Sequence, residues 1–232
     1  MSIQERYNEI IQRKDAAAIR SGRRPCDVTL VAVTKTHPYN ELNEVIDAGA
    51  TDIGENKVQE VLEKYEDVKP VRWHLIGHLQ TNKVKSIVDK VVMIHSVDSL
   101  HLAQEIDKRV AAIGKKMDIL IQINSAMEET KTGISAADLK TLCEDICREC
   151  ENVRICGLMC IPPIAATPED NRPYFQQAKA LFDEMKTWGL PADRCKPTEL
   201  SMGMSGDFEV AIEEGATIVR VGSSIFGPRN YR

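Results

Sequence analysis

The segment VTLVAVTKTHPYNELNEVIDAGA, residues 28–50, joins a run of apolar residues to an amphipathic run. Residues 28–36 are predicted to form a strand of a buried sheet, because short apolar runs rich in β-branched residues are typical of parallel strands covered on both faces. Residues 41–50 carry apolar residues at helical spacing, which predicts a helix that packs on such a strand. The segment is therefore a strand followed by a helix.

This unit recurs along the chain. Further strands are predicted at residues 51–56, 71–79, 91–98, 117–125, 152–161, 198–205 and 216–227. Helices are predicted at residues 57–68, 81–90, 99–116, 135–150, 172–189 and 207–215, and a leading helix at residues 2–22. Eight alternations in 232 residues, with no change of composition that marks a linker, favour a closed barrel over an open doubly wound sheet. The glycine-rich phosphate turn expected early in an open nucleotide-binding sheet is missing from the sequence. We predict one α/β domain over residues 1–232, a (β/α)8 TIM barrel with an extra N-terminal helix.

The composition excludes several classes of function. A formal net charge of -5 argues against a nucleic-acid partner and against binding to anionic membranes. The first residues, MSIQERYNEI, lack the apolar core of a signal peptide, and no apolar run approaches the roughly 20 residues of a membrane span. We therefore expect a cytoplasmic protein that does not contact membranes.

The cysteines do not suggest a disulfide scaffold. There are seven, so at least one thiol stays unpaired in any pairing scheme, and reduced thiols fit a cytosolic protein. Cys143, Cys147 and Cys150 fall at helical spacing, and Cys156 and Cys160 lie on the next predicted strand. A metal cluster is one interpretation. We favour small buried apolar side chains, because free cysteines are usually buried.

Lys35 interrupts the apolar run LVAVTKTHP, residues 30–38. A buried ammonium loses its hydration, so it must find a partner, deprotonate or react. Functional groups of a barrel gather at the carboxyl ends of the strands, and Lys35 lies at that end of the first predicted strand. Two interpretations stay open. The ammonium extends past the strand end into water, or a desolvated amine is the nucleophile that forms a Schiff base with a carbonyl compound.

The last two strand ends carry small hydrogen-bond donors. Arg220 lies inside the last apolar strand, which ends in Gly222, Ser223 and Ser224. The loop after the preceding strand adds Ser201, Gly203, Ser205 and Gly206. Barrels often bind phosphate in the loops after strands seven and eight, although tight turns and helix caps explain each loop taken singly. Together with Lys35, the two loops predict a site for a phosphorylated aldehyde, and pyridoxal 5'-phosphate is the candidate.

Six segments, in order along nearly the whole chain, resemble one known family. These are LVAVTKTHP, GENKVQE, WHLIGHLQTNK, HSVDS, LSMGMSGDFEVAI and VRVGSSIFG. They closely resemble the pyridoxal phosphate homeostasis proteins, also called the YggS or PROSC family. The resemblance implies a barrel like the N-terminal domain of alanine racemase, with pyridoxal phosphate held as a covalent aldimine on Lys35.

The same resemblance implies roles for further residues. The phosphate cradle maps onto Ser201, Gly222 and Ser223 and extends to Ser224. Arg220 maps onto an arginine that faces the pyridine nitrogen of the cofactor. A cation there disfavours protonation of the ring nitrogen, so we expect a chemically muted cofactor.

Other residues are expected around the same barrel mouth. Asn56, His74 and His78 are expected to line or support it, and Met202 and Met204 to pack near the cofactor as apolar filler. A strand would separate His74 from His78 by roughly 13 Å, which favours packed or hydrogen-bonded histidines over a metal-binding pair.

The leading hypothesis is a carrier of pyridoxal phosphate. Alanine racemase adds a tyrosine from a second domain as its other base, and no second domain follows the eighth strand in this sequence. We therefore expect a homeostasis protein without strong catalytic activity, which buffers the aldehyde and passes it to pyridoxal phosphate-dependent apo-enzymes. A racemase of low activity that uses Lys35 alone is the second hypothesis, and a sugar-phosphate enzyme that forms a Schiff base is the third. A monomer is the default expectation, because no exposed apolar stripe is evident.

Overall fold

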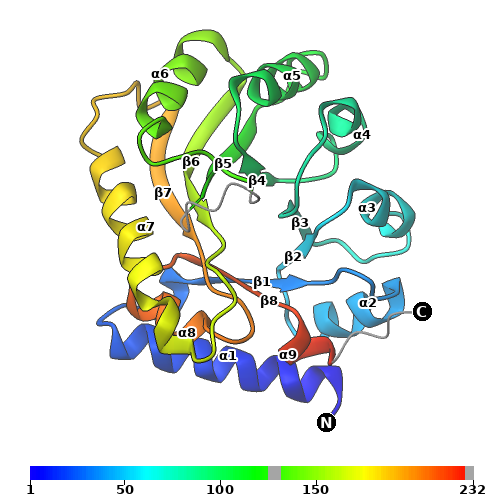
Figure 1. Ribbon diagram of the computed structural model, residues 1–232. Coiled ribbons are helices and arrows are strands. Elements are labelled where there is room, and N and C mark those ends of the chain that lie inside the picture. Colours follow the sequence, from blue (N-terminus) through cyan, green and yellow to red (C-terminus); the bar gives the residue numbers. More distant parts are fainter. Residues whose placement is uncertain (125–131, 228–232) are drawn as a thin grey trace.

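The computed structural model describes residues 1–124 and 132–227 and contains a closed barrel of eight parallel strands (Figure 1). The strands follow one another around the barrel in chain order, and the eighth pairs with the first. They are β1 Thr29–Val33, β2 Asp52–Glu55, β3 Arg72–Leu75, β4 Met93–Val97, β5 Met117–Ile123, β6 Val153–Cys160, β7 Cys195–Ser201 and β8 Ile218–Val221. The predicted TIM barrel is confirmed.

Helices alternate with the strands and lie outside the ring (Figure 1). The α-helices are α1 Ile3–Arg20, α2 Tyr39–Asp47, α3 Val58–Lys64, α4 Val84–Ile87, α5 Leu100–Ala111, α6 Leu139–Glu149, α7 Arg172–Met185, α8 Phe208–Glu213 and α9 Ser223–Phe226. Three short 3-10 turns are η1 Pro25–Asp27, η2 Thr81–Lys83 and η3 Pro168–Asn171. In the described part of the chain, no helix combines the length and the apolar character needed to cross a membrane.

The alternation of side chains along each strand divides the core into two layers. Val31 on β1 and Ile218 on β8 belong to a small apolar cluster inside the barrel. Leu30 and Ala32, the neighbours of Val31, belong to the large apolar cluster between the strands and the helices. Because side chains point alternately to opposite faces of a strand, polar groups in phase with Val31 are directed into the barrel.

Several predicted strands end earlier than expected. The strand predicted over residues 71–79 ends at Leu75, and the one predicted over residues 216–227 ends at Val221, with Ser223–Phe226 forming α9 in place of strand. The differences at β1 and β7 bear most directly on the site. The first strand was predicted to run to residue 36, but β1 ends at Val33, and Thr36 has a left-handed backbone with φ 68°. Such a conformation cannot continue a pleated strand, so Lys35 lies in a turn. Similarly, β7 ends at Ser201, because Gly203 has φ 90° and turns the chain into a loop.

The cysteines are free thiols, and five of the seven are buried. Cys143, Cys150 and Cys160 belong to the large apolar cluster, which confirms the interpretation of these residues as small core side chains. Among the residues that the structure describes, no group of three His, Cys, Asp or Glu side chains could hold a metal ion.

The extra N-terminal helix, α1, packs against α8 and α9 (Figure 1). It begins with a capping box, in which Glu5 Oε2 accepts from the Ser2 backbone N–H at 2.7 Å and Ser2 Oγ accepts from the Glu5 backbone N–H at 3.1 Å. Such a box pairs donors that have no partner within the helix. One face of α1, with Ile10 only 2% exposed, is buried in the large apolar cluster. The helix therefore completes the core.

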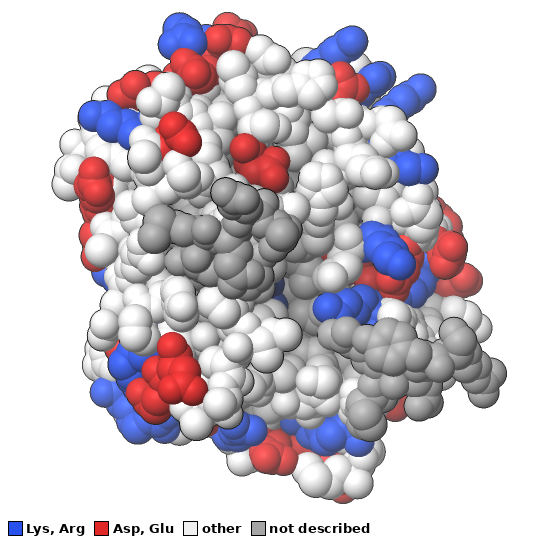
Figure 2. Space-filling view, in the orientation of Figure 1, with Lys and Arg blue, Asp and Glu red and all other residues white. Residues whose placement is uncertain are grey.

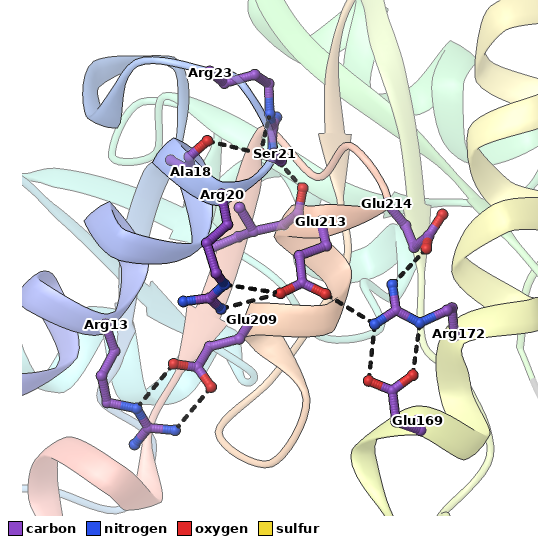
Figure 3. Close-up of polar contacts among 11 residues, drawn as sticks. Arg13, Ala18, Arg20, Ser21, Arg23, Glu169, Arg172, Glu209, Glu213 and Glu214 are labelled. Carbon is purple, nitrogen blue, oxygen red and sulfur yellow. Dashed lines mark hydrogen bonds and ion pairs between the residues drawn. The ribbon is translucent and has the colours of Figure 1, made fainter.

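Ion pairs surround this helix contact (Figure 3). Arg13 and Arg20 on α1 pair with Glu209 and Glu213 on α8, at 3.2 and 3.0 Å. Arg172 at the start of α7 also pairs with Glu213, at 2.8 Å. Both arginine side chains on α1 are about half exposed, at 42 and 52%, so their pairs should contribute little compared with the buried apolar face. Elsewhere, positive and negative side chains are interspersed on the face drawn in Figure 2.

We predict that burial holds α1 in place and that the ion pairs contribute less. Ile10→Ala is expected to lower the free energy of unfolding by about 2–4 kcal/mol, because it leaves a cavity in the core. Arg13→Ala is expected to lower it by less than about 1 kcal/mol. Urea unfolding followed by circular dichroism measures both. An equal loss in the two variants would show that the ion pairs are as important as the apolar face.

Candidate functional site

A pocket of about 440 Å³ opens at the carboxyl ends of the barrel strands. Lys35, Asn56, Arg220, Gly222 and Ser223, all predicted from the sequence, line it. The pocket thus brings the end of the first strand and the end of the last strand to one place. A volume of this size is typical of a small-molecule site.

Lys35 reaches the pocket from the turn after β1. It has the same strand parity as Val33, which also lines the pocket, whereas Thr34 is directed to the opposite face and is fully buried. The Lys35 side chain is half-buried. Lys35 therefore lies just past the end of β1 with its side chain at the pocket wall, a position that is consistent with both interpretations of this residue.

Arg220 supplies a buried cation beneath the pocket. Its guanidinium donates to Ser201 Oγ at 2.6 Å and to the Cys160 carbonyl oxygen at 2.9 Å, and the residue is 4% exposed. Burial lowers the pKa of Arg220 to about 10. Because this value is well above neutrality, Arg220 remains a cation at pH 7.

A chain of buried hydrogen bonds continues from Arg220 across the barrel interior. Ser201 Oγ lies 3.0 Å from His95 Nδ1, His95 Nε2 lies 2.9 Å from His74 Nδ1, and His74 Nε2 lies 2.8 Å from Asp52 Oδ1. Burial, followed by the proximity of His74 and Arg220, holds the pKa of His95 well below its usual range. His95 is therefore neutral.

One direction of the hydrogen bonds along the chain is consistent with the charges at its two ends. Arg220 can only donate, so the Ser201 hydroxyl accepts from it and donates to His95 Nδ1. His95 Nε2–H then donates to His74, and His74 Nε2–H donates to the Asp52 carboxylate. Burial raises the pKa of Asp52, but the hydrogen bonds from His74 and Thr51 outweigh burial and lower it. Asp52 is thus an anion that terminates the chain.

The loops after β7 and β8 form another wall of the pocket. Ser205, Gly206, Gly222 and Ser223 line it. Ser205 Oγ accepts from the backbone N–H of Gly222 at 3.1 Å, which joins the two loops. A Cβ at Gly222 would lie 3.1 Å from the Val33 carbonyl oxygen, so glycine allows this loop to approach β1 closely.

Three predicted site residues do not line the pocket. Ser201 and Met202 are fully buried, because β7 directs the Ser201 hydroxyl towards Arg220 and His95 and Met202 into the large apolar cluster. Ser224 donates its backbone N–H to Ser205 Oγ at 3.4 Å, and it is Ser205 that lines the pocket. The hydroxyl that the loop after β7 presents to the pocket is therefore that of Ser205.

The two histidines of WHLIGHL separate, but the strand predicted over residues 71–79 ends at Leu75, so that His74 lies on β3 and His78 lies in the loop after it. His74 is 1% exposed in the buried chain, and His78 lines the pocket. Sequence reasoning missed His95 in the buried chain and His37 and Gln122 at the pocket. Gln122 and His95 interrupt the apolar strands β5 and β4, and this was a signal that could have revealed them.

Comparisons with known proteins agree on one family. The family model for the alanine racemase N-terminal domain matches residues 13–230. The pyridoxal phosphate homeostasis protein of Aquifex aeolicus is 46% identical over the full length of both chains. The human protein of the same name is 38% identical, with 90% of this chain and 81% of the human chain covered.

Solved structures give the same result. PipY of Synechococcus elongatus, solved with PLP bound, has a TM-score of 0.81 and 35% identity, and the match covers 97% of this chain and 100% of PipY. An alanine racemase of Clostridium difficile has a TM-score of 0.72 at 16% identity, over 88% of this chain and 53% of the racemase. At this low identity the racemase shows a shared barrel fold.

We predict that the buried chain makes stability fall in acid. The unfolded state takes up a proton on His95 below a pKa of about 6.5, whereas the folded state keeps His95 neutral, so folding loses free energy as the pH drops below that value. Between pH 7 and pH 5, the free energy of unfolding should fall in the native protein more steeply than in His95→Gln. The difference between the two slopes should be up to about 1.4 kcal/mol per pH unit. Urea titrations at several pH values measure this. Parallel pH profiles would contradict it.

Proposed function

This chain belongs to the family of pyridoxal phosphate homeostasis proteins, and we propose that it binds pyridoxal 5'-phosphate in the pocket at the barrel mouth. The observation that carries the proposal is that Lys35 and the loop after β8 line one pocket. An amine suited to an aldehyde thus lies in the same pocket as small donors suited to a phosphate.

The polar groups of the pocket fit the phosphate, the aldehyde and the ring nitrogen of the cofactor. Ser205, Gly206, Gly222 and Ser223 offer hydroxyl and backbone N–H donors to a phosphate, and Lys35 offers a primary amine to an aldehyde. Arg220 is the buried cation that we assign to the ring nitrogen. In this proposal the cradle consists of Gly222, Ser223, Ser205 and Gly206, and Ser201 supports Arg220 from below.

We further propose that the cofactor is retained covalently. Pyridoxal 5'-phosphate supplies an aldehyde, which a primary amine converts reversibly to a Schiff base with loss of water. Lys35 is the amine in this proposal. Reversal by water releases the cofactor unchanged, which is the property that a buffering and delivering protein needs.

Arg220 is the residue that favours a carrier over a racemase. A cation beside the ring nitrogen disfavours its protonation, so the ring withdraws electrons less strongly than it does beside a carboxylate. Ser201 and the Cys160 carbonyl hold the guanidinium in place, and Arg220 keeps its charge at neutral pH because its pKa, although lowered by burial, is about 10. Among the described residues that line the pocket, moreover, none is a tyrosine that could act as a second base.

The biological setting follows as part of the same proposal. The protein buffers pyridoxal phosphate in the cytoplasm, acts as a monomer and passes the cofactor to pyridoxal phosphate-dependent apo-enzymes. The family name of the relatives supports a role in homeostasis.

We predict that Lys35 carries the cofactor. Addition of pyridoxal phosphate should turn the protein yellow, and borohydride reduction followed by peptide mass spectrometry should find the adduct on Lys35. Lys35→Ala should abolish this adduct because the amine is gone, whereas Lys85→Ala, at an exposed lysine of α4, should leave it unchanged. A colourless protein, or an adduct scattered over surface lysines, would refute the proposed function.

The phosphate cradle generates a separate prediction. Ser223→Asp places a carboxylate beside the proposed phosphate, so it should weaken retention of pyridoxal phosphate by at least about tenfold through like-charge repulsion. Pyridoxal, which lacks the phosphate, should be affected much less. Spectral titration with both aldehydes measures the two effects. Equal weakening of both would place the phosphate elsewhere.

A further inference from the structure

A buried ionic cluster lies directly behind the turn that carries Lys35. It consists of Glu55 at the end of β2 and of Glu60 and Lys64 on α3. Lys64 Nζ lies 2.8 Å from Glu55 Oε1 and 3.0 Å from Glu60 Oε2. The three side chains are 0%, 15% and 11% exposed. Charged groups are seldom buried this deeply without a specific reason.

The cluster bonds the turn on both sides of Lys35. The Thr34 hydroxyl donates to Glu55 Oε1 at 2.7 Å, and Lys64 Nζ donates to the Thr34 carbonyl oxygen at 3.2 Å. The backbone N–H of Thr36 donates to Glu60 Oε2 at 2.6 Å. The residues that flank Lys35 are therefore held from outside the barrel, while Lys35 lines the pocket inside it.

The backbone of this turn needs such support. Thr36 has φ 68° and is the one non-glycine residue with positive φ in the described part of the chain. A left-handed conformation has a steric cost for a β-branched residue, and Thr36 is exposed. The charged hydrogen bond from Thr36 N–H to Glu60 opposes that cost.

The ionisation of the cluster is consistent with this arrangement. Burial raises the pKa of Glu55 to about 7, although Lys64 and the Thr34 hydroxyl oppose the effect. Burial also acts on Glu60, but the Thr36 N–H and Lys64 outweigh it and lower its pKa. Glu55 Oε2 is buried without a hydrogen-bond partner. Glu60 is thus the carboxylate that stays charged and bonds the turn.

We propose that Glu60, supported by Lys64 and Glu55, is a positioning residue for Lys35: it holds Thr36 in its left-handed conformation and so directs the lysine amine into the pocket. This inference deepens the proposed function, on which it rests for the identity of Lys35 as the amine that takes the aldehyde. Glu55, Glu60 and Lys64 do not line the pocket.

The first test uses the protein without cofactor. Hydrogen exchange, followed by NMR, reports the protection of the Thr36 amide in the native protein, in Glu60→Gln and in Glu63→Gln. Glu63 is an exposed residue of the same helix and provides the matched control. We expect faster exchange at Thr36 in Glu60→Gln alone, with the rest of the barrel unchanged. Equal protection in all three proteins would overturn the proposal.

The second test measures how Lys35 reacts. The rate of Schiff-base formation with pyridoxal phosphate should fall about tenfold in Glu60→Gln and stay unchanged in Glu63→Gln, because a misplaced amine reacts slowly. Thr36→Gly removes the steric cost of the left-handed turn. The loss caused by Glu60→Gln should therefore be smaller in a Thr36→Gly background, and an equal loss in both backgrounds would overturn the proposal.

The outcomes separate this inference from the proposed function. If the native protein forms no adduct on Lys35, the proposed function fails, and the exchange of the Thr36 amide still decides whether Glu60 holds the turn. If the native protein forms the adduct and Glu60→Gln forms it at the same rate, the positioning role fails and the proposed function stands. If Glu60→Gln does not fold, Glu60→Asp, which keeps the charge but shortens the reach, replaces it in the same cycle.

Discussion

A buried cation must be surrounded by acceptors, and this constraint organises the interior of the barrel. Arg220 lies on the last strand, where the cost of an unpaired guanidinium would be several kcal/mol. The Cys160 carbonyl and the Ser201 hydroxyl accept from it. The same hydroxyl also donates to His95, which can accept because it is neutral. The hydrogen bonds then continue through His74 to the Asp52 anion. The position of Arg220 at the pocket thus depends on a chain of hydrogen bonds that begins at this cation and ends at the Asp52 anion.

The opposite side of the pocket is supported from outside the barrel. The turn after β1 directs Lys35 inward, and its neighbours bond to Glu55, Lys64 and Glu60 between the strands and α3. The two networks differ in kind. The inner one holds the Arg220 cation through a row of hydrogen-bonded hydroxyl and imidazole groups, whereas the outer one fixes backbone geometry by charged groups. Of the residues in the two networks, Arg220 lines the pocket, together with Lys35 and the small donors of the last two loops.

Much of the site could be predicted from residues that break a local pattern. Lys35 and Arg220 stand out because each interrupts an apolar strand, and the glycines and serines after β8 stand out because they follow a strand end. Ser201 and Ser205 could not be distinguished in this way. Both are serines of one segment, and the difference depends on where β7 ends, which the left-handed backbone at Gly203 determines. His95 was visible as a polar residue in an apolar strand, but nothing local indicates that its partner is a serine on β7.

The sequence by itself determined the number and order of the strands and of the helices that alternate with them, because apolar periodicity is a local property of the chain. It did not reveal α9, which lies in the predicted last strand. It also determined which face of each strand a residue occupies, because side chains alternate with a period of two. Closure of the barrel decided the rest. Pairing of β8 with β1 brings Lys35 and Gly222 to one pocket, and His95 meets Ser201 across the interior. Such contacts join residues far apart in the chain, and their geometry depends on strand register and strand ends, which only the packed structure defines.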